Sequence, residues 1–341
     1  MKNLKKVIAI LISLSFIFSM VIIAAPKKVE AANPYLPLWE HIPDAEVHLF
    51  HDPADITQER VYIYGSHDLI RASTYCAYDI VSWSTPPDDM TDWHYEGPVY
   101  TFVRNNNNLP STLFAPDCAE VKRKVALTSG INRDTYTDNQ KLAPSDYDER
   151  KYDEYPVYYD KKNDCGYVFD YYLYPHPNGI TWVICHSKGS PTGPFEIVNA
   201  DANSNKLAIL EDGSTAVNNG FDPGVVVDTD EDGYAVAAYL WWAGFDTIVA
   251  CKLNMNNMAS AEFDQALADQ DTTGKYNSDP TSSDYGVKRN FLPVAGVSNY
   301  SNVHAWPLED NINPDDPTKN KYDILDKEDL DLIRIFEASS P

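Results

Sequence analysis

The chain has 341 residues, of which 43% are hydrophobic, and its formal net charge is −24 at pH 7. This length allows one large domain or two ordinary ones with a sizeable core. The strong negative charge argues against nucleic acid as a partner, because contacts to phosphate need a basic surface.

Residues 1–31 have the pattern of a secretory signal peptide. Lys2, Lys5 and Lys6 precede an apolar run over residues 7–25, and the small residues Val29 and Ala31 then predict cleavage after Ala31. We expect the mature chain, residues 32–341, to be secreted and to have no membrane contact after cleavage. An uncleaved anchor is the alternative, because the apolar run is at the edge of spanning length.

Strand patterns dominate the rest of the chain. Helical periodicity is weak, and its best candidate is the short segment 260–269. Three long polar stretches, 121–154, 202–219 and 269–290, are predicted to be surface loops. The β-branched and aromatic runs predict strands at 47–51, 61–64, 155–159, 167–174, 181–186, 225–228, 234–242 and 247–253.

The expected strands form groups, and each group opens with an acid beside a proline or a small residue. These acids are Asp44, Asp117, Asp222 and Glu337. Uneven spacing between similar groups suits the blades of a β-propeller with loop insertions, in which the first strand of each blade surrounds the central axis. The acids would then converge on one cavity.

We therefore predict an all-β fold, a five-bladed β-propeller that is incomplete in this chain. The sequence holds about three blades and the start of a fourth, so a closed ring would need roughly another blade and a half after Glu337. The expectation is a fragment of a longer protein or a truncated gene product.

Converging carboxyl groups suit the hydrolysis of glycosidic bonds. One protonated carboxyl gives a proton to the leaving oxygen, and one carboxylate activates water or attacks the sugar. A third carboxylate nearby raises the pKa of the acid by repulsion. A single Asp in a turn is more commonly a structural residue, so the pattern matters more than each member.

Six segments in order give the sequence a resemblance to glycoside hydrolase family 43, from about Asn33 to the last residue, with a poor match in the insertion after Asp117. The resemblance implies a five-bladed β-propeller that cleaves arabinose- or xylose-containing polysaccharides with inversion. The segments are NPYLPLWEHIPDAEVHLF, VYIYGSHD, LFAPD, SPTGPFE, FDPGVVVDTDEDGYAVAAYLWW and FEASS.

The same resemblance implies a role for each of the acids. Asp44 corresponds to the general base, Glu337 to the general acid, and Asp117 to the acid that modulates pKa and orientation. An inverting site would hold Asp44 and Glu337 about 6.5 to 9.5 Å apart, which leaves room for water. Asp222 and Glu46 are candidate substrate-binding residues, although a turn role for Asp222 is an equal alternative.

Other residues were considered as binding groups. Trp39 precedes Asp44 closely, and its indole face is a candidate wall for a sugar ring, with simple packing as the alternative. Asp228 to Gly233 resembles half of a calcium loop, but Tyr239 stands where a bidentate Glu is needed, so a hairpin turn is favoured. His48 and His51 are expected on opposite strand faces, a poor metal pair, and therefore as local hydrogen-bonding residues.

No cofactor is required by these expectations. An axial calcium is known in the family, but its ligand is expected outside this sequence, so calcium is not supported here. The five cysteines form no CxxC pair and are expected mainly as buried thiols. Two alternatives to a secreted glycosidase remain: an inactive or carbohydrate-binding propeller remnant, and a secreted structural or adhesive β-protein.

Overall fold

The computed structural model describes most of the chain between Glu40 and Arg289. The chain divides into two compact units, Met1–Pro37 and Leu38–Pro341, and every sheet belongs to the second. The predicted signal peptide, Trp39, the loop 202–219 and Glu337 lie outside the described residues. The residues that the structure describes are 36–37, 40–68, 78–101, 103–104, 109–110, 112–177, 183–198, 221–243, 248–269, 276–282, 285–289, 312–313 and 316–320.

The first sheet is an antiparallel meander in which each strand pairs with the next. Its strands are β1 (Glu46–Asp52), β2 (Asp55–Ser66), β3 (Asp79–Thr85) and β4 (His94–Thr101), in the order β1-β2-β3-β4. The β1–β2 register shifts between His51 and Asp52, next to the hairpin turn. Such a bulge turns the following side chains away from strict alternation.

The second sheet has the order β11-β10-β9-β7, with β8 paired to β9. The long insertion between β7 and β8 contains two short 3₁₀ helices, η1 (Arg133–Thr135) and η2 (Pro144–Asp146). The strands are β7 (Leu113–Val125), β8 (Tyr158–Asp160), β9 (Cys165–Pro177), β10 (Cys185–Lys188) and β11 (Glu196–Ile197).

The third sheet has the order β12-β13-β14-β15, and β16 pairs with β14. One short helix, α2 (Gln265–Asp269), follows β15, and two small hairpins, β5–β6 and β17–β18, stand apart from the sheets. The bounds are β5 (Val103–Arg104), β6 (Leu109–Pro110), β12 (Phe221–Thr229), β13 (Ala235–Ala243), β14 (Ile248–Leu253), β15 (Ala261–Glu262), β16 (Val287–Arg289), β17 (Ile312–Asn313) and β18 (Asp316–Asn320).

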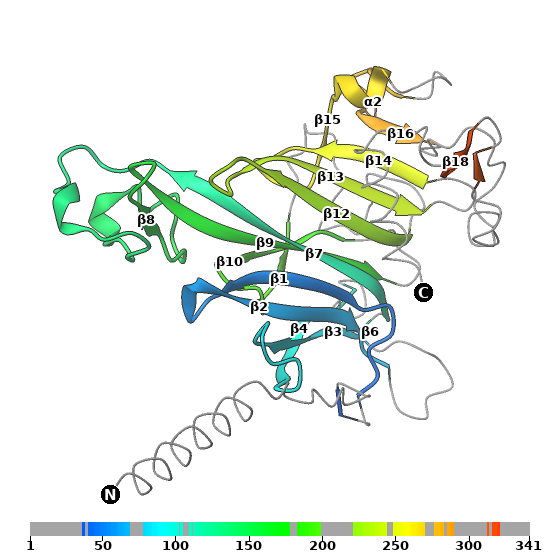
Figure 1. Cartoon of the computed structure of the whole chain (residues 1–341), viewed down its shortest axis with the longest axis horizontal. Helices are drawn as coiled ribbons and strands as arrows, with labels where there is room; N and C mark the ends of the chain where they lie inside the picture. Colours follow the sequence, from blue (N-terminus) through cyan, green and yellow to red (C-terminus); the bar gives the residue numbers. More distant parts are fainter. Residues whose placement is uncertain are drawn as a thin grey trace, which may run out of the picture. The chain divides into compact units, whose positions relative to one another are not determined.

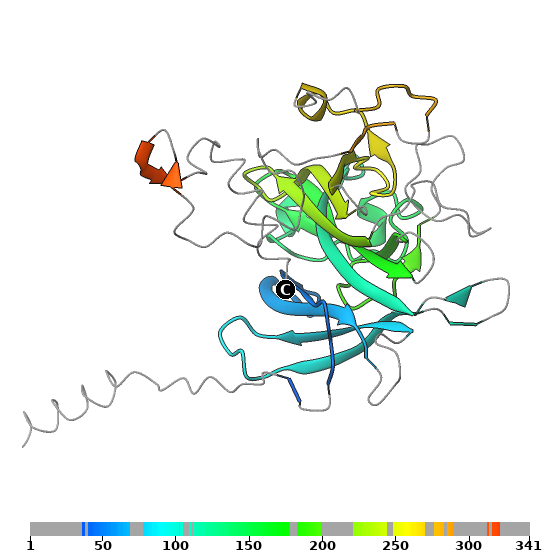
Figure 2. The same ribbon diagram turned by 90° about the vertical axis from the view of Figure 1, so that its right-hand side faces the viewer.

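These three sheets have the strand order of propeller blades, and the all-β prediction is confirmed. Strand β7 opens the second sheet and contacts β1 and β2 of the first sheet and β12 of the third (Figure 1). The view turned by 90° also places the β1–β4 sheet and the β12–β15 sheet on either side of β7 (Figure 2). The described residues hold the three expected blades, whereas the expected start of a fourth, at Glu337, lies outside them.

Strand β9 is buried on both of its faces, and its side chains alternate between two cores. Tyr171 and Leu173 belong to a cluster shared with Phe50 and Tyr62 of the first sheet. Tyr172 and Tyr174 belong to a second cluster, which includes Leu240, Trp242 and Val249 of the third sheet. The two-residue period of a strand therefore makes β9 the common wall of both cores.

The sequence misplaced several boundaries. The loop predicted from Val121 is wrong at its start, because β7 continues to Val125. The charged residues Lys122, Arg123 and Lys124 suggested a surface loop, but they belong to a strand in which Val121 is fully buried. Strands β3 and β4 were not predicted. The helical candidate 260–269 is helical only from Gln265, and the predicted loop 269–290 contains β16.

Two smaller predictions are confirmed. The Asp228 to Gly233 segment is the turn between β12 and β13, where the Asp230 carboxylate accepts hydrogen bonds from the backbone N–H groups of Asp232 and Tyr234, each at 2.9 Å. The four cysteines that the structure describes are free thiols, and Cys118, Cys185 and Cys251 are buried. Among the described residues, none of the helices is long and apolar enough to cross a membrane.

Because β9 packs against both cores, shortening one of its buried side chains should strongly lower the free energy of unfolding. Leu173 is fully buried, so Leu173→Ala should lower the free energy of unfolding by about 2–5 kcal/mol, through lost burial and the remaining cavity. Urea unfolding followed by tryptophan fluorescence measures it. Leu49→Ala is the matched control, since Leu49 is 51% exposed. An equal effect of the two substitutions would contradict this description of the core.

Candidate active site

Asp117 is the residue at which the three sheets meet. Its buried carboxylate accepts a hydrogen bond from His48 of β1, with 2.8 Å between Nε2 and Oδ1. The same Oδ1 accepts the N–H of Cys118 at 2.7 Å, and Oδ2 accepts the N–H of Val225 in β12 at 2.5 Å. One carboxylate thus joins one residue from each of the three sheets.

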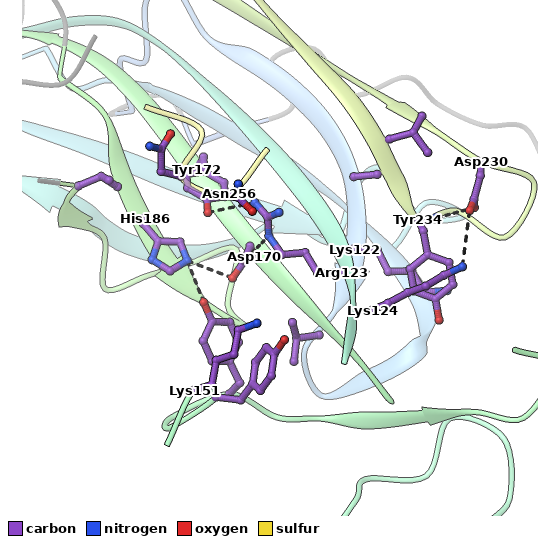
Figure 3. Close-up of a pocket in the computed structure, with 17 residues that line it drawn as sticks. Lys122, Arg123, Lys124, Lys151, Asp170, Tyr172, His186, Asp230, Tyr234 and Asn256 are labelled. Atoms are coloured by element: carbon purple, nitrogen blue, oxygen red, sulfur yellow. Dashed lines mark hydrogen bonds and ion pairs between the residues drawn. The ribbon is translucent and has the colours of Figure 1, made fainter. Parts of the chain in front are cut away.

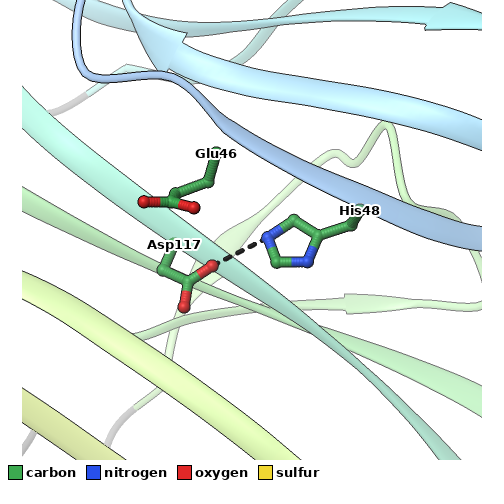
Figure 4. Close-up of side chains that lie close together, drawn as sticks. All are labelled: Glu46, His48 and Asp117. Carbon is green, nitrogen blue, oxygen red and sulfur yellow. Dashed lines mark hydrogen bonds and ion pairs between the residues drawn. The ribbon is translucent and has the colours of Figure 1, made fainter. Parts of the chain in front are cut away.

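Glu46 lies beside this junction and points into it (Figure 4). One ligand atom from each of Glu46, His48 and Asp117 lies within 4.8 Å of the others. Burial of the carboxyl and the charge of Asp117 raise the pKa of Glu46 from its ordinary 4.5 to about 7, against a smaller opposite effect of His48. Near neutral pH, Glu46 is therefore divided between the acid and the carboxylate.

Asp44 and Asp222 open the first and third sheets in the same unusual conformation. Both have a left-handed backbone, with φ of 51° for Asp44 and 52° for Asp222, a region that Asp tolerates better than most residues. Burial of its carboxyl and the negative charge of Asp44 raise the pKa of Asp222. These two acids therefore interact electrostatically across the sheets.

The GSHD segment at the end of β2 holds the chain that leads to Asp44. A Cβ added to Gly65 would lie 2.0 Å from Cγ2 of Ile42, so only glycine lets this segment pass so closely. The Ser66 hydroxyl donates to the Pro43 carbonyl at 3.3 Å, and the Asp68 N–H donates to the His41 carbonyl at 3.0 Å. The motif noted in the sequence is therefore a support for Asp44.

A second histidine–carboxylate pair, His51 and Glu120, lies further along the same two strands, β1 and β7. His51 Nδ1 lies 2.7 Å from Glu120 Oε1, and the Glu120 carboxylate also accepts the backbone N–H of His51 at 2.9 Å and the Tyr171 hydroxyl at 2.7 Å. The expected hydrogen-bonding role of His48 and His51 is confirmed. Their expected opposite orientation is wrong, because both side chains reach acids of β7. The β1–β2 register is regular from Glu46 to His51 and shifts only after His51, so the bulge does not account for this.

Of the predicted site residues, the structure brings Glu46 to Asp117 and Asp44 to Asp222. Glu337 and Trp39 lie outside the described residues. Sequence reasoning underrated His48 and missed Glu120. The available signal was the equal spacing of His48 and His51 against Asp117 and Glu120, three residues apart on strands that open adjacent groups.

The donor set at Glu46, His48 and Asp117 does not fit calcium. Calcium takes six to eight oxygen ligands, whereas this cluster offers two carboxylates and an imidazole nitrogen. Both oxygens of Asp117 already accept hydrogen bonds from His48 and two backbone N–H groups. That no cofactor is required remains a prediction.

Comparison with known proteins relates the chain to sugar-cleaving enzymes. No family model matches the chain. Over 87 residues it is 46% identical to a protein named xylosidase/arabinosidase from Thermoclostridium stercorarium, a match that covers 25% of this chain and 17% of that protein. The likeness in sequence thus spans about a sixth of the curated relative's length.

Solved structures of family 43 enzymes are also among its neighbours, at low similarity. A GH43_1 enzyme from Xanthomonas citri has 16% identity and a TM-score of 0.35, covering 67% of this chain and 56% of that chain. A thermostable family-43 glycoside hydrolase has 14% identity and a TM-score of 0.33, covering 67% of this chain and 53% of that one.

The raised pKa of Glu46 predicts a pH-dependent effect of its substitution. A folded pKa of about 7 against 4.5 means that folding favours the proton, so this group's stabilisation is present below pH 4.5 and is lost as the pH rises through 7. Glu46→Gln cannot ionise. The Tm of the variant minus that of the wild type should therefore increase between pH 4.5 and pH 8, measured by scanning calorimetry.

Glu231→Gln, in the exposed turn between β12 and β13, is the control for this experiment and should not reproduce the increase. A difference in Tm between Glu46→Gln and wild type that stays constant over this pH range would contradict the placement of Glu46 in a desolvated, negatively charged environment.

Proposed function

We propose that the chain belongs to a secreted glycoside hydrolase that cleaves arabinose- or xylose-containing plant polysaccharides or oligosaccharides with inversion. The observation that carries the proposal is the approach of Glu46 to Asp117 and of Asp44 to Asp222, together with the similarity to the xylosidase/arabinosidase. Carbohydrate is the proposed partner, and a neutral sugar is not repelled by the acidic chain.

In the proposed mechanism, Asp44 is the general base. It takes a proton from water while the water attacks the anomeric carbon, and Glu337 gives a proton to the leaving oxygen. The exposed position of Asp44 at the start of the first sheet leaves its carboxylate accessible to water and substrate. Its left-handed backbone, and the close contact of Gly65 with the segment around Ile42, hold Asp44 in place.

Asp117 is proposed to act through its charge rather than by touching the reacting atoms. Its carboxylate is fixed by three hydrogen bonds, and it already raises the pKa of Glu46. The same repulsion would keep the acid Glu337 protonated when the two carboxyl groups are close. Asp117 is therefore assigned as the residue that modulates pKa.

Glu46 and Asp222 are proposed to bind the sugar. With a pKa of about 7, Glu46 is substantially protonated near neutral pH, and a protonated carboxyl can donate a hydrogen bond to a sugar hydroxyl as well as accept one. Asp222, beside Asp44, offers a second acceptor. Trp39 is assigned as an aromatic wall against which a sugar ring stacks.

Substitutions of the base and the acid test the proposal. Asp44→Asn, which preserves the left-handed backbone, should lower kcat/KM on aryl arabinofuranosides or xylosides by about 10²–10⁴-fold through loss of general base catalysis. Asp92→Asn, in the exposed β3–β4 turn, is the control. Glu337→Ala should abolish most activity on natural oligosaccharides but less on aryl substrates, whose leaving groups need little protonation.

A fully active Asp44→Asn or Glu337→Ala enzyme on natural oligosaccharides would refute the assigned roles. NMR observation of the first product anomer decides inversion. Sugar binding without hydrolysis by the complete protein would favour a carbohydrate-binding remnant, and neither binding nor hydrolysis would favour a structural or adhesive β-protein.

Secretion is proposed from residues 1–31 alone. The secreted protein should begin at Ala32, because the basic start, the apolar run and the small residues before the cleavage point occur in the required order. Amino-terminal sequencing of protein from the culture medium measures this. Recovery of the intact Met1 end in a membrane fraction would contradict cleavage.

A further inference from the structure

His48 has no part in the reaction proposed above, although its imidazole lies beside two of the acids that do. Its Nε2 lies 2.8 Å from Oδ1 of Asp117, and one ligand atom from each of Glu46, His48 and Asp117 lies within 4.8 Å of the others (Figure 4). The side chain of His48 is 21% exposed and that of Asp117 is 7% exposed. This hydrogen bond is therefore largely shielded from water, which makes it stronger than an exposed one.

The imidazole of His48 is held in one orientation by aromatic neighbours. Phe50 lies two residues further along β1 on the same strand face, and the two rings stack at a centroid distance of 5.0 Å with 5° between their planes. The Tyr64 ring lies 6.2 Å away, tilted by 55°. Phe50 and Tyr64 are both buried in a closely packed core. The direction of the His48 N–H is therefore fixed by the fold.

The three hydrogen bonds of the Asp117 carboxylate come from three strands. A carboxylate oxygen accepts, so Nε2 of His48 carries the hydrogen and donates to Oδ1. The other two donors are the backbone N–H groups of Cys118, the next residue in β7, and of Val225 in β12. Loss of the His48 side chain would leave this carboxylate bonded to β7 and β12, but no longer to β1, the strand that carries Glu46.

His48 also acts on the charge of Glu46. Burial of the Glu46 carboxyl and the negative charge of Asp117 raise the pKa of Glu46 to about 7, and the positive charge of His48 opposes this rise. The imidazole thus limits the repulsion between two acids that lie close together. Without it, the pKa of Glu46 should rise further.

The pair of His186 and Asp170 differs from this arrangement in one important way. It lies at a cavity of about 690 Å³ whose lining includes Lys124 and Arg123 (Figure 3). The Asp170 carboxylate lies 3.0 Å from His186 and accepts from the Arg123 guanidinium at 2.5 Å, so a permanent cation balances its charge.

Asp117 has no such cation beside it. In the part of the chain that the structure describes, no lysine or arginine nitrogen lies within 4.0 Å of its carboxylate. The imidazole of His48 is the side chain that faces this charge.

From the shielded hydrogen bond and the fixed ring, we propose that His48 is a positioning residue for the hydrolysis, which holds the Asp117 carboxylate in one orientation between β1 and β12. The inference rests on the proposed function and adds to that site a side chain that touches neither the sugar nor the reacting atoms. His48 transfers no proton in this role. It keeps the charge of Asp117 in place while other groups react.

Steady-state kinetics of the complete protein on aryl arabinofuranosides or xylosides test the inference. His48→Ala should lower kcat about 10–100-fold, the effect of losing one hydrogen bond to a charged group. KM should change little, because His48 does not bind the sugar. His48→Gln should recover most of the lost kcat, since a glutamine N–H can replace the imidazole N–H.

His51→Ala is the matched control. It removes the neighbouring histidine–carboxylate pair between β1 and β7, whose acid, Glu120, has no assigned part in the reaction. This variant should leave kcat unchanged. The Tm of each variant shows that it is folded.

The titration of Glu46, followed by NMR of its carboxyl carbon, gives a second measurement that needs no activity. Both His48 variants lack the positive charge, so the pKa of Glu46 should lie above the wild-type value of about 7 in both, including His48→Gln, whose kcat recovers. His51→Ala should not change it. The two measurements therefore separate the hydrogen bond of His48 from its charge.

The inference is overturned if the wild type hydrolyses these substrates and His48→Ala keeps its kcat, if His48→Gln is no better than His48→Ala, or if His51→Ala loses as much kcat. An identical Glu46 titration in the wild type and both His48 variants would also overturn it, because the imidazole would then not lie beside Glu46. If the wild type shows no hydrolysis at all, the proposed function fails and this inference fails with it, so the two failures are distinguished.

Discussion

The arrangement of the three sheets depends on the hydrogen bonds of one carboxylate. Asp117 accepts from a side chain of the first sheet and from backbone N–H groups of the second and third. A buried carboxylate is stable only when such donors replace its lost hydration. The first strands of the sheets are thereby held at one point, and Glu46 comes close to it from β1.

Much of this arrangement could be predicted from local sequence. The repeated acid at the start of a strand group identified Asp44, Asp117 and Asp222. Strand β1 begins just after Asp44 and β12 just before Asp222, whereas Asp117 lies inside β7, which begins at Leu113. The boundaries were weaker. Lys122, Arg123 and Lys124 look like a loop because their charges are conspicuous, but in the structure they extend a strand whose apolar partners, Ala119 and Val121, face a core. A strand edge beside a polar cavity can carry charge without ending.

The pairing of side chains across sheets was beyond the reach of sequence reasoning. Alternation assigned His48 and His51 to opposite faces, yet both side chains reach acids of β7, a strand of another sheet whose position the alternation cannot include. The raised pKa of Glu46 likewise comes from burial and from Asp117, which lies on another strand far along the chain. The cavity near Lys124 joins segments from two sheets, and no spacing within one segment would indicate it.

The double burial of β9 has a consequence for how the protein is made. The first sheet is complete in sequence at Thr101, yet its side chains Phe50 and Tyr62 pack against Tyr171 and Leu173. During synthesis, Phe50 and Tyr62 cannot complete this packing until β9, which ends at Pro177, has left the ribosome. The nascent chain therefore depends on rapid delivery of its middle strands, and a pause in translation within the insertion before β8 would prolong the stage at which it is most prone to aggregate.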